Sequence, residues 1–297
     1  AADALLTAPA ARRRLQRTLA FVRGQPLNAL AVLLVVLLFA TAVFAPVLAT
    51  HDPLVIDPLA KLQDPGREHW LGTDGLGRDV YSRILYGARV SLAVGLGATL
   101  MGTVLGTLIG VLSGYLGGVV DQVIQRITDG LQAIPPVVFL LLVAAIWRQG
   151  MLSILVIITV LVAPYTGRVI RGAVLAERES QYVLAAQSLG ARPLRVMLRH
   201  ILPNVFAPVI VLASFAVGDA ILTEGALSYL GFGIPVDDPT WITSWGGMLR
   251  PDDLQYMLDA PWLSVFPGVA ITITVLAFNV TGDALRDALD PKLRGRR

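Results

Sequence analysis

Few side chains in this sequence could perform covalent or metal chemistry. The chain has no cysteine and three histidines, His51, His69 and His200. The first two lie in a proline-rich segment and lack the spacing of metal ligands. No nucleophile stands beside a base, as hydrolytic chemistry would require. A glycine-rich loop that ends in lysine and serine or threonine is also missing, so the chain is not expected to hydrolyse ATP. We expect no catalytic residue, no metal and no cofactor in this chain.

Carboxylates inside apolar stretches are the other chemically informative residues. Asp129, Asp219 and Glu224 occur where the surrounding sequence is long and apolar. Because a charge that faces lipid is costly, these side chains should face a bundle interior or a wet cavity, where they could line a solute path. For Asp219 and Glu224, an internal ion pair or a helix-end position is an equally good interpretation. For Asp129, a position at the membrane interface beside Arg126 is favoured.

The elements that must position these residues are membrane-spanning helices. The 297 residues are 55% hydrophobic and 15% charged, and their mean hydropathy is +0.68. Soluble chains carry about a quarter charged residues, and the dispersed net charge of +3 does not indicate nucleic-acid binding. The pattern predicts an all-α polytopic membrane protein embedded in the lipid bilayer. Six transmembrane helices are expected, at about residues 27–48, 91–113, 119–146, 151–167, 205–226 and 262–285.

The distribution of basic residues predicts the orientation. A basic N-terminus followed by an apolar run could be a signal peptide, but the run from Leu27 to Leu48 is long enough to span a bilayer. Most of the 24 lysines and arginines fall on the side that six spans assign to both termini. That side is therefore predicted to be cytoplasmic. Residues 1–90 should form a basic cytoplasmic N-terminus, the first transmembrane helix and an external segment. Residues 91–297 should form a five-helix core with a cytoplasmic loop at 173–203.

The external segment contains a second helical pattern, before the expected second span. Thr73 or Asp74 could cap a helix there. Its apolar residues would share one face and its arginines another, which favours an amphipathic helix on the membrane surface. A contact surface for an external partner is the alternative. The arginines concerned are Arg78, Arg83 and Arg89.

Glycines recur every fourth residue in the second span. Such a ladder gives a helix one smooth face, on which another helix can pack closely in lipid. We therefore expect a helix–helix seam with a structural role, formed by Gly102, Gly106, Gly110 and Gly114.

Residues 177–204 are polar and arginine-rich, although they lie between two apolar spans. Ser180 could cap a short helix, and Gly190 could end it in the left-handed conformation. Pro193 fits the first turn of a second helix, and Pro203 would begin the next span. In the first helix, four apolar or small residues have helical spacing: Tyr182, Ala185, Ala186 and Leu189. In the second, Leu194, Met197, Leu198 and Ile201 should share a face, with Arg195 and Arg199 away from it.

An ordinary basic loop that only fixes topology is one interpretation of this segment. However, the run AAQSLG followed by RHILPN resembles the coupling loop of ABC importer permeases, although Leu184 stands where that family has glutamate. The resemblance implies that this loop sits in a cleft of a cytoplasmic ATPase subunit. The residues it assigns to coupling are Ser180, Tyr182, Ala185, Ala186, Leu189, Gly190, Ala191, Arg195, His200 and Pro203.

Three longer runs resemble the C-type permease subunit of dipeptide and oligopeptide importers. They are WLGTDGLGRDVYSRILYGARVSL, GALSYLGFG and NVTGDALRDALDPKLR, and the likeness extends from about Leu27 to Arg294. It implies a type I ABC importer permease fold in a bacterial plasma or inner membrane. The implied partners are a homologous B-type permease subunit, cytoplasmic ATPase subunits that bind ATP and Mg²⁺, and an extracytoplasmic substrate-binding protein. Nickel and glutathione permeases share these runs, so their solutes remain alternatives.

Two other classes of protein stay open on the residues alone. A secondary transporter would use intramembrane charges as ion sites and need no ATPase. It usually shows an inverted repeat, and none is evident in this sequence. A membrane enzyme is the third class, and the short inventory of reactive side chains disfavours it.

Overall fold

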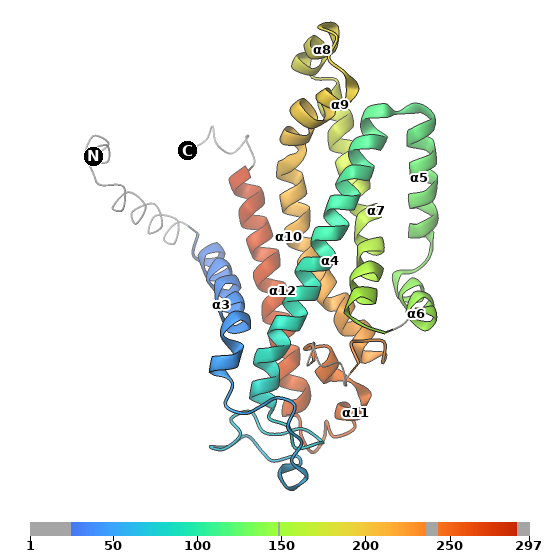
Figure 1. Cartoon of the computed structure of the whole chain (residues 1–297). Coiled ribbons are helices and arrows are strands. Elements are labelled where there is room, and N and C mark those ends of the chain that lie inside the picture. Colours follow the sequence, from blue (N-terminus) through green and yellow to red (C-terminus); the bar gives the residue numbers. More distant parts are fainter. Residues whose placement is uncertain (1–24, 148, 236–242, 290–297) are drawn as a thin grey trace, which may run out of the picture.

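The computed structural model describes residues 25–147, 149–235 and 243–289, and within these ranges it is helical, with one isolated β-bridge between Thr73 and Asp79. Long helices lie side by side in a bundle (Figure 1). The basic N-terminal residues 1–24 and the basic tail after residue 289 lie outside the described ranges. The principal helices are α3 (Pro26–Leu48), α4 (Val80–Leu116), α5 (Gly118–Ala133), α6 (Pro136–Ile146), α7 (Met151–Arg178), α8 (Gln181–Ser188), α9 (Pro193–Val196), α10 (Leu202–Tyr229), α11 (Pro251–Leu254) and α12 (Trp262–Leu289).

The number of membrane crossings agrees with the prediction of six. Five of the described helices are long and apolar enough to span a bilayer, and the bent pair α5–α6 makes a sixth if it counts as one span. In Figure 1, α8 and α9 lie at one end of the bundle, and the start of α3 and the end of α12 are the ends of those helices nearer to it. The segments before α4 and before α12 lie at the other end of the bundle. This arrangement places the predicted cytoplasmic loop on the side of both described chain ends.

The second span is longer than predicted, and the separate surface helix expected before residue 91 is not formed. Helix α4 runs without interruption from Val80, and Asp79, not Thr73 or Asp74, caps it by accepting a hydrogen bond from the Ser82 N–H at 2.8 Å. Two of the three arginines of the expected polar face are buried, since Arg78 and Arg83 are 7% and 4% exposed, whereas Arg89 is exposed. The prediction of a separate surface helix failed because a nearby buried carboxylate pairs with the two buried arginines. This pairing lets a charged residue lie inside a continuous helix.

That carboxylate belongs to Asp74, which is fully buried. It accepts hydrogen bonds from Arg78 Nε at 2.7 Å and from the backbone N–H groups of Leu76 and Arg78 at 2.8 and 3.0 Å, and it also pairs with Arg83. Burial alone would raise the pKa of Asp74. The two arginine charges and the backbone donors outweigh burial and lower it below its usual value.

The third span is broken at the two prolines, as their position predicted, but it does not cross straight. The axes of α5 and α6 differ by 89°. Pro136 is the first residue of α6, where the missing N–H costs nothing. Neither α5 nor α6 alone is long enough to span the bilayer.

The glycine ladder of α4 lies against α7. A Cβ atom placed on Gly106 would be 2.6 Å from the Ala163 carbonyl oxygen, and one on Gly110 would be 2.7 Å from the Gly167 carbonyl oxygen. Added carbons on Gly102 and Gly114 would similarly meet side chains of α7 at 2.7 and 2.9 Å. The two backbones are therefore as close as only glycine allows, and this seam joins the two ends of the bundle.

Candidate functional site

Helices α8 and α9 form a two-helix segment at the end of the bundle, beyond α7 and α10 (Figure 1). We call residues 179–201 the coupling segment. Five of its residues, Met197–Ile201, form a π-helical turn that leads into α10. The Leu202 N–H bonds to the Met197 carbonyl, five residues back, and Pro203 then lies in the first turn of α10. The wider turn allows a proline, which has no N–H group, to follow a helix without a break.

The bend between α8 and α9 has the predicted left-handed glycine. Gly190 has φ +77°. Its N–H donates to the Gln187 carbonyl at 2.9 Å, and the Ala191 N–H donates to the Ala186 carbonyl at 3.1 Å. These two bonds make a Schellman motif, which fixes the angle at which the chain leaves α8. No atom lies within 4 Å of a Cβ placed on Gly190, so only the backbone conformation restricts substitution there.

One buried side chain anchors α8, and the sequence reasoning missed it. Val183 is 0% exposed and packs in a cluster with Val174 of α7, Val196 of α9 and Ile201 of the π-turn. A single β-branched residue in a short polar helix gives no periodic signal. The predicted shared face of the second helix is wrong in part, because Val196, Met197 and Ile201 are buried whereas Leu194 and Leu198 are exposed. The π-turn changes the register and separates them.

A hydrogen-bond network around Tyr182 connects α8 to both neighbouring spans. The Tyr182 hydroxyl donates to the carboxylate of Glu177 on α7 and accepts from Asn204 Nδ2 on α10 at 2.9 Å. Asn204 also donates to the His200 carbonyl at 2.7 Å. Partial burial, and then the bond to Glu177, raise the pKa of Tyr182 above its usual value. Sequence analysis found Tyr182 and His200 but not Glu177 or Asn204.

Several large apolar side chains lie on the outer surface of the coupling segment. Leu189 is 89% exposed, and Leu184, Leu194 and Leu198 are between 46% and 62% exposed. Ala185 and Arg195 are exposed as well, and Ala186 and Ala191 are half-buried. Ser180 precedes the first turn of α8, but its side chain makes no capping hydrogen bond, contrary to the prediction. Exposed apolar groups on a firmly anchored element are typical of a contact surface.

The three carboxylates in apolar stretches have different surroundings. Asp129 pairs with Arg168 of α7 at 2.6 Å, with both side chains at least half exposed, so the expected neighbour Arg126 is not its partner. Glu224 is fully buried, and its Oε1 accepts hydrogen bonds from Ser228 at 2.6 Å and Ser244 at 2.5 Å. Two serine donors satisfy Glu224 Oε1, whereas Oε2 is buried and has no hydrogen-bond partner among the described residues. The bond from Ser244 also ties α10 to the loop that precedes α11.

Asp219 is placed differently from Glu224. It lies in the middle of α10 with its side chain exposed on the surface of the single chain, not in the bundle interior. A lipid-facing carboxylate in this position would be costly.

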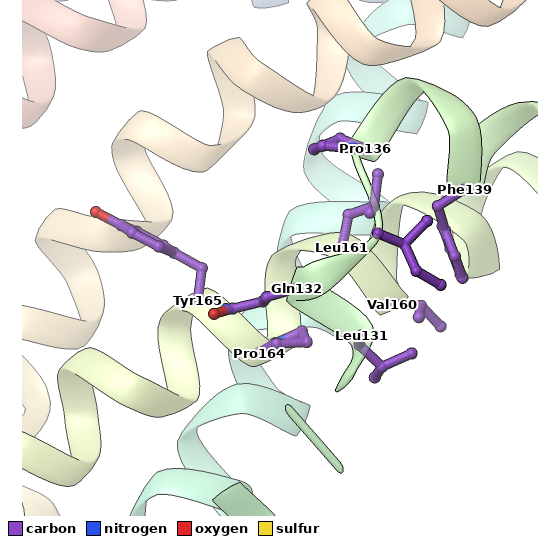
Figure 2. Close-up of a pocket in the computed structure, with 9 residues that line it drawn as sticks. Leu131, Gln132, Pro136, Phe139, Val160, Leu161, Pro164 and Tyr165 are labelled. Carbon is purple, nitrogen blue, oxygen red and sulfur yellow. The ribbon is translucent and has the colours of Figure 1, made fainter. Parts of the chain in front are cut away.

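A cleft of about 210 Å³ lies between the α5–α6 break and α7. Figure 2 shows side chains from the two sides facing one another, among them Leu131, Phe139 and Val160, with the polar ends of Gln132 and Tyr165 on the same side. The bend at Pro135 and Pro136 opens this space, because α6 turns away from the axis of α5. The cleft is largely apolar, which suits an apolar side chain or another helix better than an ion.

Known proteins of similar sequence identify the family of this chain. The family of binding-protein-dependent transport system inner membrane components matches residues 106–295. The dipeptide transport system permease protein DppC of Alkalihalophilus pseudofirmus is 38% identical over 85% of this chain and 82% of its own length. The oligopeptide transport system permease protein OppC of Bacillus subtilis is 38% identical over 92% and 88%. The glutathione transport system permease protein GsiD of Shigella flexneri is 39% identical over 92% and 89%.

Among solved structures, a chain of the methionine ABC transporter MetNI in an inward-facing conformation has the same fold. The TM-score is 0.57 at 19% identity, over 70% of this chain and 96% of that one. The all-helical bundle agrees with these comparisons, and so does the segment that leaves the bundle between α7 and α10. The sequence matches also cover most of the chain. The chain belongs to the family of binding-protein-dependent transport system inner membrane components.

Proposed function

We propose that this chain is one of two homologous permease subunits of an ATP-driven importer, and that its coupling segment docks in an apolar cleft of a cytoplasmic ATPase. Membership of the family makes the chain a multi-pass inner-membrane permease subunit that works with a substrate-binding protein and an ATPase. The chain itself is not an enzyme. Coupling must therefore pass through a protein–protein contact.

The observation that carries the docking proposal is the combination of exposed and anchored residues in the coupling segment. Leu184, Leu189, Leu194 and Leu198 present apolar area outwards, whereas Val183 is buried and Tyr182 bonds to α7 and α10. A surface that binds a moving partner must be accessible, and it must be rigid enough to pass the motion on. Because Asn204 belongs to the first turn of α10, displacement of α8 would move that span directly.

Asp219 is our candidate for the solute path or for the seam with the second permease subunit. Its carboxylate is exposed in the middle of a span, where contact with lipid would be costly. The cleft beside Tyr165 is likewise open on the single chain, so a neighbouring subunit or a solute side chain could fill it. Asp129 is a weaker pathway candidate, since an arginine already pairs with it. Glu224 remains a candidate, because serines bond to its Oε1 but its buried Oε2 has no hydrogen-bond partner among the described residues.

Peptides are the solute class that the relatives favour. The three relatives described above are named for dipeptides, oligopeptides and glutathione, and glutathione is itself a tripeptide. We propose di- or oligopeptides as the cargo, with glutathione or nickel as the alternatives. Uptake of a labelled dipeptide by proteoliposomes that contain the assembled importer tests this directly. Accumulation of nickel but not of peptide would overturn it.

A pair of matched variants tests the docking surface. Leu189→Asp places a charge at the centre of the proposed contact and should abolish co-purification of the ATPase with the permease. Leu59→Asp is the control, because Leu59 is 93% exposed but lies in the external segment, where no ATPase can reach. Neither change touches a buried group, so both variants should fold. Equal recovery of ATPase with both variants would contradict the proposal.

A further inference from the structure

Three side chains that are far apart in the sequence meet beside the start of α4. His51 follows the end of α3, His69 lies in the external segment, and Asp79 caps α4. The Nδ1 atoms of His51 and His69 lie 3.8 and 2.9 Å from the same oxygen, Oδ1 of Asp79. The two imidazole rings are 4.6 Å apart between centroids. In each residue, one potential ligand atom lies within 4.8 Å of those of the other two.

We infer that His51, His69 and Asp79 form an external binding site for a divalent transition metal of the Zn²⁺ class. Two imidazole nitrogens and one carboxylate oxygen are a donor set that Zn²⁺, Ni²⁺ and Cu²⁺ prefer over Ca²⁺ or Mg²⁺. In a tetrahedral site with metal–ligand bonds of about 2.0–2.2 Å, neighbouring ligand atoms are roughly 3.3–3.6 Å apart. The two distances to Asp79 Oδ1, 2.9 and 3.8 Å, lie on either side of that range, so small rotations of the side chains would create the site.

The surroundings of the three residues fit a site with an open position. The side chain of His51 is 39% exposed, whereas those of His69 and Asp79 are 12% and 1% exposed. A cation could therefore enter from the His51 side, and water could complete the coordination. Thr50 Oγ1 lies 3.1 Å from His51 Nδ1 and adds an oxygen at the edge of the site.

The carboxylate is oriented by a contact outside the proposed ligand set. Oδ2 of Asp79 accepts the Ser82 N–H at 2.8 Å, which leaves Oδ1 turned towards the histidines. Outer contacts of this kind hold metal ligands in position. A bound metal would join the end of α3, the external segment and the start of α4, and so would stiffen the external end of the bundle.

A purely structural hydrogen bond between His69 and Asp79 is the competing interpretation, and it does not require His51. The test therefore uses His51→Ala, a change at an exposed residue that leaves the cap of α4 intact. The matched control is His200→Ala, which removes the remaining histidine, in the coupling segment. Since the chain has three histidines and no cysteine, no thiolate can contribute to metal binding.

The experiment is calorimetric titration of Zn²⁺ into the full chain, purified in detergent without a polyhistidine tag. One Zn²⁺ should bind per chain, and Ca²⁺ should not displace it. His51→Ala should weaken binding by more than about 10-fold, since loss of an outer contact alone costs 10–100-fold. His200→Ala should bind as the unmodified chain does. Zn²⁺ should also raise the melting temperature of the unmodified chain and of His200→Ala but not that of His51→Ala. Absence of Zn²⁺ binding, or equal binding by His51→Ala, would overturn the inference.

Discussion

The two ends of the bundle are held together in different ways. At the external end, residues 49–79 fold back onto the start of α4 through buried polar groups, above all Asp74 with Arg78 and Arg83. At the opposite end, the coupling segment rests on α7 and α10 through Val183 and the Tyr182 network, and its leucines face outwards. The external end is thus held by buried ion pairs within the chain, whereas the coupling end leaves large apolar side chains exposed. The glycine seam between α4 and α7 connects the two ends.

The largest loss of stability is expected from Asp74→Asn, at the external end. The variant keeps the shape of the side chain but leaves two buried arginine charges without their carboxylate. Breaking a buried ion pair in this way typically costs about 3–5 kcal/mol. The melting temperature of the purified chain should fall clearly. Asp64→Asn, at an exposed position in the same segment, is the control and should have an effect of about 0.5 kcal/mol or less. Equal melting temperatures for the two variants would mean that buried charge does not hold this end together.

The same carboxylate predicts a pH dependence. The pKa of Asp74 in the folded chain is below its usual value of 3.8, so its stabilising contribution is fully present above that pH. The contribution is lost as the pH falls through the lower, folded-state pKa. The difference in melting temperature between the unmodified chain and Asp74→Asn should therefore be constant near neutral pH and shrink below about pH 4. A difference that grew on acidification would have the wrong sign.

A substitution in the glycine seam between α4 and α7 should cause the next largest loss of stability. Gly106→Val would drive a side chain into the Ala163 carbonyl oxygen, and overpacking of this kind costs about 1–3 kcal/mol. Gly172→Val on α7 is the matched control, because no atom lies within 4 Å of a Cβ placed there. Thermal unfolding in detergent should separate the two. Similar melting temperatures would show that α4 and α7 are not closely packed in the membrane protein.

The smallest effect on stability, but a large one on function, is expected from Gly190→Val. A β-branched residue at φ +77° costs about 1–2 kcal/mol and should distort the bend between α8 and α9. We expect ATP hydrolysis by the assembled importer to continue while uptake falls. Gly190→Asn should retain more uptake, because asparagine tolerates the left-handed conformation better. Normal uptake by the valine variant would mean that the bend does not transmit force.

Local signals in the sequence predicted much of the coupling end. Gly190 and Pro193 mark helix ends whatever surrounds them, so the bend between α8 and α9 followed from residue type. The long apolar runs likewise predicted the spans to within a few residues, except at the start of α4 and at the end of α7, which continues to Arg178. Local patterns could not reveal that Asp74 neutralises Arg78 and Arg83, and therefore placed the start of α4 wrongly.

Contacts between distant segments account for the other omissions. Val183 is an unremarkable residue in a short helix, and only its packing against α7 and the π-turn makes it an anchor. His51 and His69 lack ligand spacing along the chain, yet the external segment brings both to Asp79. Sequence spacing can reveal a metal site within one helix or loop, but it cannot reveal one that three separate segments build.

The central claim is that the coupling segment faces the cytoplasm, where an ATPase can bind it. Because the chain has no cysteine, Leu189→Cys and Leu59→Cys each introduce a unique thiol. A membrane-impermeant maleimide applied to intact spheroplasts should label Leu59→Cys, and it should label Leu189→Cys only after the membrane is permeabilised. Labelling of Leu189→Cys in intact spheroplasts would contradict the orientation and, with it, the proposed contact with the ATPase.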